Sequence, residues 1–343
     1  MRAILTILSL FSATMFAGCF CVSEKPQFER SEPNPRATLL FVGDVMCHAP
    51  QIAKANGVNG YDFNSCFKYV KPIFEDADYT VANLETTLGY SEPYSGYPRF
   101  KSPAALAEAL AAAGVDMVST ANNHTLDYGA EGVLSTIDIA RKCGLEVIGT
   151  NIPNPLRIRI KGIDFAFLTY THSTNGIALP EGVSVPMLDT LAMARDLAAA
   201  SDADCRVAFL HWGAEYSSVP SRGQRAVADF LYRAGCQIVI GSHSHTVQGA
   251  VCDGRRVTAY SLGNFISNQS GHNNEGGIMA RVTVEKCADG CQYWLDIEPV
   301  WVDRSDYTVI PKSVGDTLAM NSRVQASYRS FMSHTAKLFK KSL

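Results

Sequence analysis

The sequence predicts an α/β fold built on a largely parallel sheet. From Ala37 onward, short apolar runs alternate with amphipathic stretches, which is the pattern of repeated strand–helix–strand units. Later in the chain, strand-like runs are joined by turn sequences, so antiparallel hairpins are expected beside the parallel strands. The chain has 343 residues, of which 47% are hydrophobic and 18% charged, and this composition suits one large core with at most a small appendage.

The first half of this core is expected to alternate strictly between strands and helices. The run that ends at Gly43-Asp44 is apolar enough for a buried strand, and the helix that follows Ser102-Pro103 has a proline at its start and Gly114 past its end. Helical spacing of apolar residues defines the other helices. The expected elements are strands over 38–42, 79–84, 115–120 and 145–149 and helices over 62–77, 104–113 and 129–143.

The second half adds hairpins to the same alternation. Lys161-Gly162 lies between two strand-like runs, which predicts a hairpin over 157–170. A second turn sequence, 287–291, joins strands expected over 277–284 and 292–302. The remaining expected elements are helices over 189–200 and 220–234, strands over 206–210, 237–240 and 256–262, and a helical, surface-bound tail.

The N-terminus has the features of an export signal. Arg2 precedes an apolar run that is too short for a comfortable membrane span, and small residues lead to Cys19. A cysteine directly after Ala-Gly resembles the lipidation site of bacterial lipoproteins, which favours a lipid-anchored protein of the cell envelope on its periplasmic or surface side. The alternative is an ordinary signal peptide with an incidental cysteine. The expected organisation is a signal peptide over 1–18, a tether over 19–36, the main domain over 37–312 and the tail over 313–343.

The cysteine pattern and the net charge limit which metal sites, disulfides and binding partners are expected. The sequence contains ten cysteines but no CxxC pair beyond the export region, so a structural zinc site is not expected. Cys287 and Cys291 flank a turn and either bridge a hairpin in an oxidising compartment or remain two thiols. The formal net charge of −3, without a long basic block, argues against broad binding to nucleic acid.

Polar residues with metal-binding side chains follow nearly every predicted strand. Because the carboxyl ends of parallel strands gather at one edge of a sheet, we expect these side chains to converge there. One histidine after one strand would indicate little, and an isolated Asp44 could cap a loop. Together, the residues at strand ends are Asp44, His48, Asn83, Glu85, Asn122, Asn123, His124, His211, Glu215, His243, His245 and Asn264.

The mixture of ligand types indicates a transition-metal centre. Carboxylates together with imidazoles suit Zn, Mn or Fe better than Ca or Mg alone, and the number of candidates suffices for two divalent ions. Two ions a few ångströms apart can clamp a phosphoryl group and activate water. His243 and His245 project to the same side if their segment is extended. The structural interpretation is preferred for His172, His272 and His334, and packing is preferred for Trp212 and Tyr216.

The motifs at these strand ends resemble the CapA family, which is named for poly-γ-glutamate capsule synthesis and belongs to the metallo-dependent, calcineurin-like phosphatase superfamily. The resemblance extends over roughly residues 38–265 and implies a four-layer α/β/β/α sandwich. The motifs that carry it are Gly43-Asp44-Val45-Met46, Asn83-Leu84-Glu85, Ala121-Asn122-Asn123-His124, His211-Trp212-Gly213-Ala214-Glu215-Tyr216, Gly241-Ser242-His243-Ser244-His245 and Ser261-Leu262-Gly263-Asn264-Phe265.

The resemblance also implies a role for each residue. Asp44 and His245 would bind the first metal, and Glu85 would bridge both ions. The second metal would be bound by Asn123, His211 and His243. His124 would be the general acid beside the leaving group. The substrate, or the side chains that bind the metals, would be contacted by His48, Asn83, Asn122, Glu215 and Asn264.

Two positions depart from the superfamily pattern and leave three functions open. Met46 stands where a histidine is usual, His48 lies farther along the chain, and Glu85 replaces the usual aspartate. The first function is a metal-dependent hydrolase acting on a phosphoester or a related polar bond. The second is an assembly factor that binds an anionic polymer and works with membrane-bound capsule synthesis or export proteins. The third is a degenerate site that only recognises a capsule or cell-wall component.

Overall fold

The computed structural model describes residues 33–339, and the chain from Asn34 onward forms one compact unit. The predicted signal peptide, most of the predicted tether and Cys19 lie outside the described residues. Within the described residues, no helix is long and apolar enough to cross a membrane.

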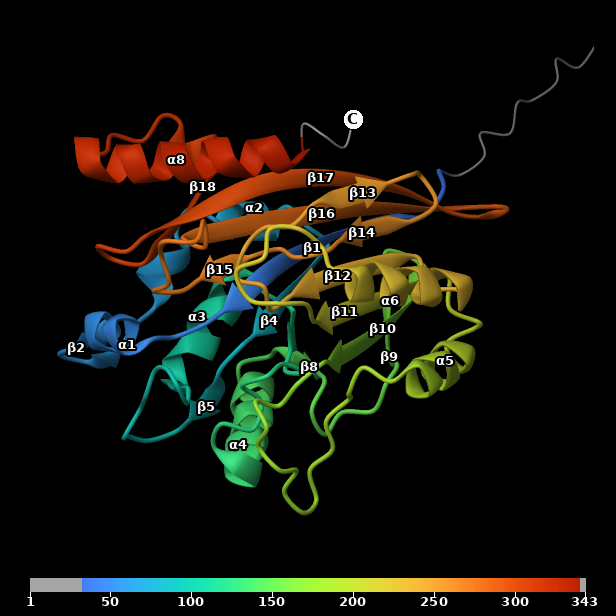
Figure 1. Ribbon diagram of the computed structural model, residues 1–343, viewed down its shortest axis with the longest axis horizontal. Helices are drawn as coiled ribbons and strands as arrows, with labels where there is room; N and C mark the ends of the chain where they lie inside the picture. Colours follow the sequence, from blue (N-terminus) through green and yellow to red (C-terminus); the bar gives the residue numbers. More distant parts are fainter. Residues whose placement is uncertain (1–32, 340–343) are drawn as a thin grey trace, which may run out of the picture. The chain divides into compact units, whose positions relative to one another are not determined.

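Two mixed sheets form the centre of the fold (Figure 1). In the first sheet the order is β18-β17-β16-β1-β4-β7-β8, and β15 also pairs with β1. The pairs β1–β15, β1–β4, β4–β7 and β7–β8 are parallel, whereas the pairs β1–β16, β16–β17 and β17–β18 are antiparallel. The bounds are β1 (Arg36–Val45), β4 (Tyr79–Leu84), β7 (Met117–Ser119), β8 (Glu146–Ile148), β15 (Asn264–Ile266), β16 (Gly276–Cys287), β17 (Gly290–Asp303) and β18 (Thr308–Pro311).

The second sheet has the order β13-β14-β12-β11-β10-β9. Its central strands are parallel, and the predicted hairpin around Lys161-Gly162 is confirmed as the antiparallel pair β9–β10. The bounds are β9 (Leu156–Ile160), β10 (Ile163–Thr171), β11 (Cys205–His211), β12 (Ile238–Ser242), β13 (Ala250–Cys252) and β14 (Val257–Ala259). Two further two-stranded sheets consist of β2 (Asn56–Gly57) with β3 (Gly60–Tyr61) and of β5 (Thr87–Gly89) with β6 (Lys101–Pro103).

The two sheets pack face to face, with helices on both outer faces. Between the sheets the apolar core includes Phe41 of β1 and Phe209 of β11, whose rings meet edge to face at 6.1 Å. On the outer face of the first sheet lie α1 (Ala49–Ala55), α2 (Lys71–Glu75), α3 (Ala105–Ala113) and α4 (Gly129–Lys142). The outer face of the second sheet is covered by α5 (Thr190–Ala199) and α6 (Arg222–Arg233). The four-layer α/β/β/α sandwich is therefore confirmed.

The C-terminal segment lies along the first sheet. It contains α7 (Lys312–Gly315), which contacts β17 and β18, and α8 (Ser322–Phe339), which runs beside β17 (Figure 1). Phe331 of α8 is only 2% exposed, and the ring of Tyr328 packs edge to face on Trp301 of β17. One face of α8 is therefore part of the core, which the sequence interpretation as a surface-bound helix did not include.

Two local expectations are wrong for identifiable reasons, and for Cys287 and Cys291 the structure shows one of the two alternatives left open. The single helix expected over 62–77 is divided into the 3-10 helix η1 (Asn64–Phe67) and α2, because Pro72 starts a new helix and has no amide hydrogen to continue the preceding one. The strand expected over 256–262 ends early, at Ala259. Cys287 and Cys291 are free thiols, because the register pairs Cys287 with Gly290 and Lys286 with Cys291 and so places the two side chains on opposite faces of the hairpin.

Candidate metal centre

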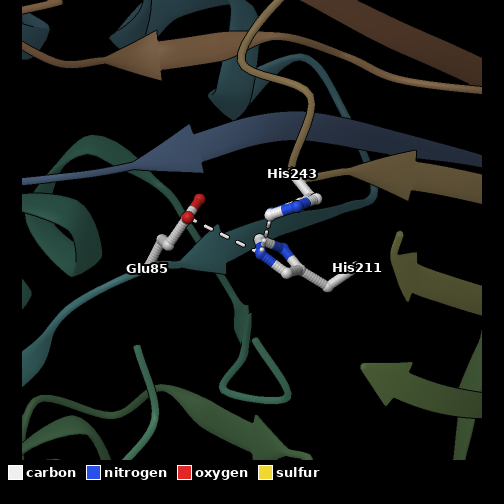
Figure 2. Close-up of side chains that lie close together, drawn as sticks. All are labelled: Glu85, His211 and His243. Atoms are coloured by element: carbon white, nitrogen blue, oxygen red, sulfur yellow. Dashed lines mark hydrogen bonds and ion pairs between the residues drawn. The ribbon is translucent and has the colours of Figure 1, made fainter. Parts of the chain in front are cut away.

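The carboxyl ends of strands from both sheets meet at one site. Asp44 lies at the end of β1, Glu85 directly follows β4, and His211 ends β11. His243 and His245 follow β12. Figure 2 shows Glu85 from the first sheet facing His211 and His243 from the second. The strand-end rule therefore located residues that are up to about two hundred positions apart in the chain.

The acidic and imidazole side chains form two sets that share one residue. One set consists of Glu85, His211 and His243, and the other of Asp44, Glu85 and His245. In each set the ligand atoms lie within 4.8 Å of one another, and all five residues are buried. Three converging donors per set match the first coordination shell of a transition metal, and the shared Glu85 occupies the position of a bridging carboxylate.

Glu85 is a buried acid with an unpaired oxygen. Its side chain is fully buried, and its Oε1 has no hydrogen-bond partner in the described part of the chain. This oxygen lies 3.5 Å from His211 Nε2 and 3.8 Å from His245 Nε2. Burial and the neighbouring Asp44 raise the pKa of Glu85 well above its usual value. A cation between these atoms would satisfy the oxygen and stabilise the carboxylate.

One ring nitrogen of His211, Nε2, lies close to several atoms that carry lone pairs. This nitrogen lies 2.8 Å from Asn123 Oδ1 and 3.0 Å from His243 Nδ1, in addition to Glu85 Oε1. Burial lowers the pKa of His211 well below its usual value and that of His243 to about 2, so both rings are held neutral. Neutral imidazole is the form that binds a metal. Lone pairs that face one another in this way fit a bound metal ion better than a closed hydrogen-bond network, because the ion would accept them.

Neighbouring polar groups fix the orientation of the second set. Asn83 Nδ2 donates to Asp44 Oδ1 over 2.8 Å, while Asp44 Oδ2 and Asn264 Oδ1 each lie 3.1 Å from His245 Nδ1. Asp44 and Asn264 are register partners of β1 and β15, and a Cβ at Gly43 would come within 2.0 Å of the Gly263 carbonyl oxygen. The close approach that glycine permits therefore places Asn264 beside the acidic ligand.

The loop after β12 carries its two histidines in an unusual conformation. His243 has φ of 91° and His245 has φ of 56°, so both occupy the left-handed region that non-glycine residues rarely adopt. The segment is therefore not the extended one considered from the sequence, and both imidazoles still reach the site. Ser242 Oγ lies 2.9 Å from His211 Nδ1 and fixes that ring from behind.

His124 lies beside the two sets with its own carboxylate. Its Nδ1 is 2.8 Å from Asp127 Oδ2, and this same oxygen accepts a hydrogen bond from the Phe100 amide. The Phe100 ring meets the His124 ring edge to face at 4.7 Å. Sequence reasoning missed Asp127, although its spacing of three residues from His124 was a readable signal. Asp127 would stabilise a protonated His124, as a general acid requires.

The remaining predicted residues support the site from its margins. Asn122 donates to the carbonyl of Leu84 over 2.8 Å and so fixes the loop that carries Glu85. His48 does not join either metal set; its Nδ1 accepts from the Asn268 amide over 3.3 Å and lies 3.2 Å from Gln51 Oε1. Glu215 is exposed and lines a cavity together with Asn123 and His124.

Two further buried or neighbouring residues, His172 and Met46, belong to neither metal set. The ring of His172 lies 4.3 Å from that of His243, and its Nδ1 lies 3.0 Å from the carbonyl oxygen of His211. His172 belongs to neither metal set and packs beside the ligands, which agrees with the structural interpretation. The side chain of Met46 is 2% exposed but joins none of the apolar clusters of the described residues.

The chain is similar to bacterial capsule proteins over most of its length. The family model described as bacterial capsule synthesis protein PGA_cap matches residues 38–269. The capsule biosynthesis protein CapA of Bacillus anthracis is 28% identical, over 89% of this chain and 75% of that protein. The PGA biosynthesis protein CapA of Bacillus subtilis (strain 168) is 27% identical, over 84% of this chain and 77% of that protein.

One solved structure aligns with most of this chain. The crystal structure of 5'-nucleotidase from Candida albicans SC5314 aligns with a TM-score of 0.47 and 11% sequence identity. The alignment covers 88% of this chain and 58% of the nucleotidase chain.

Proposed function

This chain belongs to the bacterial capsule synthesis family PGA_cap, and we propose that it is a metal-dependent hydrolase of phosphoester-type bonds in capsule or poly-γ-glutamate biosynthesis or export. The relatives named CapA support the place in capsule biosynthesis. The observation that carries the enzymatic part is the buried Oε1 of Glu85, which has no hydrogen-bond partner among the described residues and belongs to the side chain that two sets of converging ligands share.

The side chains present suit two divalent ions of the Mn, Zn or Fe type. Asp44, Glu85 and His245 would hold one ion, and Glu85, His211 and His243 the other, with the Asn123 amide oxygen beside the second set. Two such ions supply Lewis acidity toward a phosphoryl oxygen and lower the pKa of water. These residues bring two carboxylates, so a site loaded with two divalent cations keeps positive charge that favours an anionic substrate.

The chain's own proton donor would be His124. The Nδ1 hydrogen of its ring would be donated to Asp127 Oδ2, which leaves Nε2 as the atom that carries or releases a proton. Phe100 packs on the ring and restricts its rotation. His124 and Asn123 line the same cavity, so a leaving group bound there would lie within reach of the proton donor.

The test combines metal analysis with a substrate panel. Purified protein should contain divalent metal and hydrolyse aryl phosphomonoesters or phosphodiesters in a chelator-sensitive manner. Asp44→Ala and His243→Ala should lose both properties, whereas Glu215→Gln, at the exposed margin, should keep its metal. Wild-type turnover in either alanine variant would refute the hydrolase proposal, and metal-loaded protein inactive on every member of the panel would count against it.

A specific observation keeps a second candidate, a capsule-polymer binding or assembly factor. Met46 supplies no ligand where the superfamily has a histidine, and His48 is occupied elsewhere. A site with one ligand fewer can still bind the carboxylates of an anionic polymer. Binding of poly-γ-glutamate measured with and without chelator, alongside the substrate panel, separates the two: metal-dependent binding without turnover would favour the assembly factor.

We also propose a lipid anchor at Cys19 and a location in the cell envelope, where membrane-bound capsule synthesis or export proteins could be partners. The proposal rests on the short apolar run and the Ala-Gly-Cys sequence. Labelled fatty acid should be incorporated by the wild type and not by Cys19→Ser, and fractionation should move this variant out of the membrane fraction. Equal labelling of both proteins would rule out this anchor.

A further inference from the structure

A cavity beside His124 contains a cationic side chain that no role at the metal centre requires. We propose that Arg99 binds a second anionic group of the substrate, so that the substrates of this site carry an anionic group at the metals and another, a carboxylate or a phosphate, at Arg99. This inference deepens the proposed function and rests on it. It concerns a residue that the strand-end pattern of the sequence did not indicate.

The cavity connects Arg99 with the catalytic region. Its volume is about 310 Å³, and its wall includes Asn123 and His124 on the side of the metal sets. Arg99 and Tyr97 line it from the loop before β6, and Glu215 lines it from the loop after β11. At about 30 Å³ for each water of liquid, this space holds roughly ten water-sized groups, enough for a substrate part beyond the reacting bond.

The backbone on the C-terminal side of Arg99 is held in place by two contacts. Its carbonyl oxygen accepts a hydrogen bond of 2.6 Å from Ser95 Oγ. The next residue, Phe100, is fully buried between His48 and His124, and its amide donates to Asp127. The arginine therefore starts from a rigid position next to the proton donor, and this preorganisation lowers the entropic cost of binding a ligand.

The guanidinium group has no partner among the residues that the structure describes. Over residues 33–339 it makes no side-chain hydrogen bond, ion pair or cation–π contact, and Glu215 on the same cavity wall does not come within ion-pair distance of it. Arg157, by contrast, is paired with Asp202. A free planar guanidinium beside a cavity is suited to bidentate binding of a carboxylate or phosphate.

The test compares probes that differ only in the second anionic group. Phenyl phosphate, 3-carboxyphenyl phosphate and 1,3-phenylene bisphosphate would be titrated calorimetrically into the metal-loaded protein. The wild type should bind the two doubly anionic probes about 10- to 100-fold more tightly than phenyl phosphate, as expected for a charged hydrogen-bonded pair. The stronger of the two identifies the second group as carboxylate or phosphate.

Variants then assign the preference to the guanidinium. Arg99→Gln should lose the preference while its affinity for phenyl phosphate stays unchanged, and Arg99→Lys should retain part of it. Arg255→Gln, which removes another exposed arginine lining a different cavity, should behave as the wild type. A preference that survives in Arg99→Gln, or a wild type without preference, would overturn the inference. Failure of the wild type to bind phenyl phosphate would instead refute the proposed function and the inference with it.

Discussion

Glu85→Gln isolates the one carboxylate that both metal sets share. The substitution keeps the shape of the side chain and one oxygen but removes the charge. In the structure, Glu85 Oε1 lies 3.5 Å from His211 Nε2 and 3.8 Å from His245 Nε2. The substitution therefore weakens a ligand atom that belongs to both sets. We therefore expect both ions to bind more weakly, whereas a ligand of only one ion would affect one.

The expected size follows from the burial of the site. Removing one partner of a buried charge pair costs about 3 kcal/mol or more, which is roughly a 100-fold increase in Kd. At a metal concentration of about 100 times the wild-type Kd, each ion stabilises the wild type by about 2.7 kcal/mol, but the variant by only about 0.4 kcal/mol. For a chain of this size, the difference of about 2 kcal/mol per ion corresponds to a loss of about 5 °C in the metal-induced rise of Tm.

The metal-free proteins provide a second readout with a defined sign. Burial and Asp44 raise the pKa of Glu85, so its contribution to the free energy of unfolding is complete below the unfolded pKa and declines as the pH rises. Metal-free wild type should therefore lose stability from about pH 4 towards neutrality relative to Glu85→Gln. Thermal unfolding with and without metal, with Glu215→Gln as control, measures both effects. Equal metal-induced shifts in Glu85→Gln and wild type would refute the bridging role.

Four further substitutions test separate parts of the structure. His124→Gln should lower kcat about 10²- to 10⁴-fold at unchanged metal content, and an unchanged kcat would exclude His124 as proton donor. Met46→His adds a nitrogen two residues after Asp44 and should tighten metal binding in competition with a chelator. Burial lowers the pKa of His48 from 6.5 to about 4, so metal-free wild type should lose about 3 kcal/mol as the pH falls through this range, and His48→Gln less, as measured by urea unfolding. Phe331→Ala should cost about 3 kcal/mol or more of unfolding free energy, because the ring is buried between α8 and the sheet.

The central strands could be predicted from the sequence because burial on both faces makes them continuous apolar runs. β1, β4, β10, β11 and β12 are of this kind, and each was expected close to its observed bounds. The assignment of strands to two sheets could not be predicted in the same way. β15 pairs with β1 across more than two hundred residues, and no local pattern of three residues specifies such a partner. The division of the helix over 62–77 was readable at Pro72.

The candidate ligands could be predicted because their position depends on topology more than on side-chain contacts. Parallel strands bring their carboxyl ends to one edge, and this alone places Asp44, Glu85 and His211 near one another. Asp127 and His172 act through contacts of their side chains with other rings, which are set by packing between loops. Their contribution therefore becomes visible only when the loops after β7 and β10 are seen together.

The departures at positions 46 and 85 change different properties of the site. Methionine and neutral histidine both carry no charge. Compared with a histidine at this position, Met46 therefore offers one ligand fewer but leaves the charge around a bound ion unchanged. Glu85 keeps the carboxylate charge of an aspartate but has a longer arm, and in this fold its Oε1 lies between His211 and His245, which belong to different sets. With two divalent ions, Asp44 and Glu85 neutralise only half of the four positive charges, whichever residue stands at position 46. The remaining charge would be buried among neutral imidazoles, where the dielectric response is weak, and a bound anionic group would compensate it. The driving force for binding phosphate or carboxylate would therefore not require a histidine at position 46, and Met46 would change only the number of positions left open for ligands on an ion bound by Asp44.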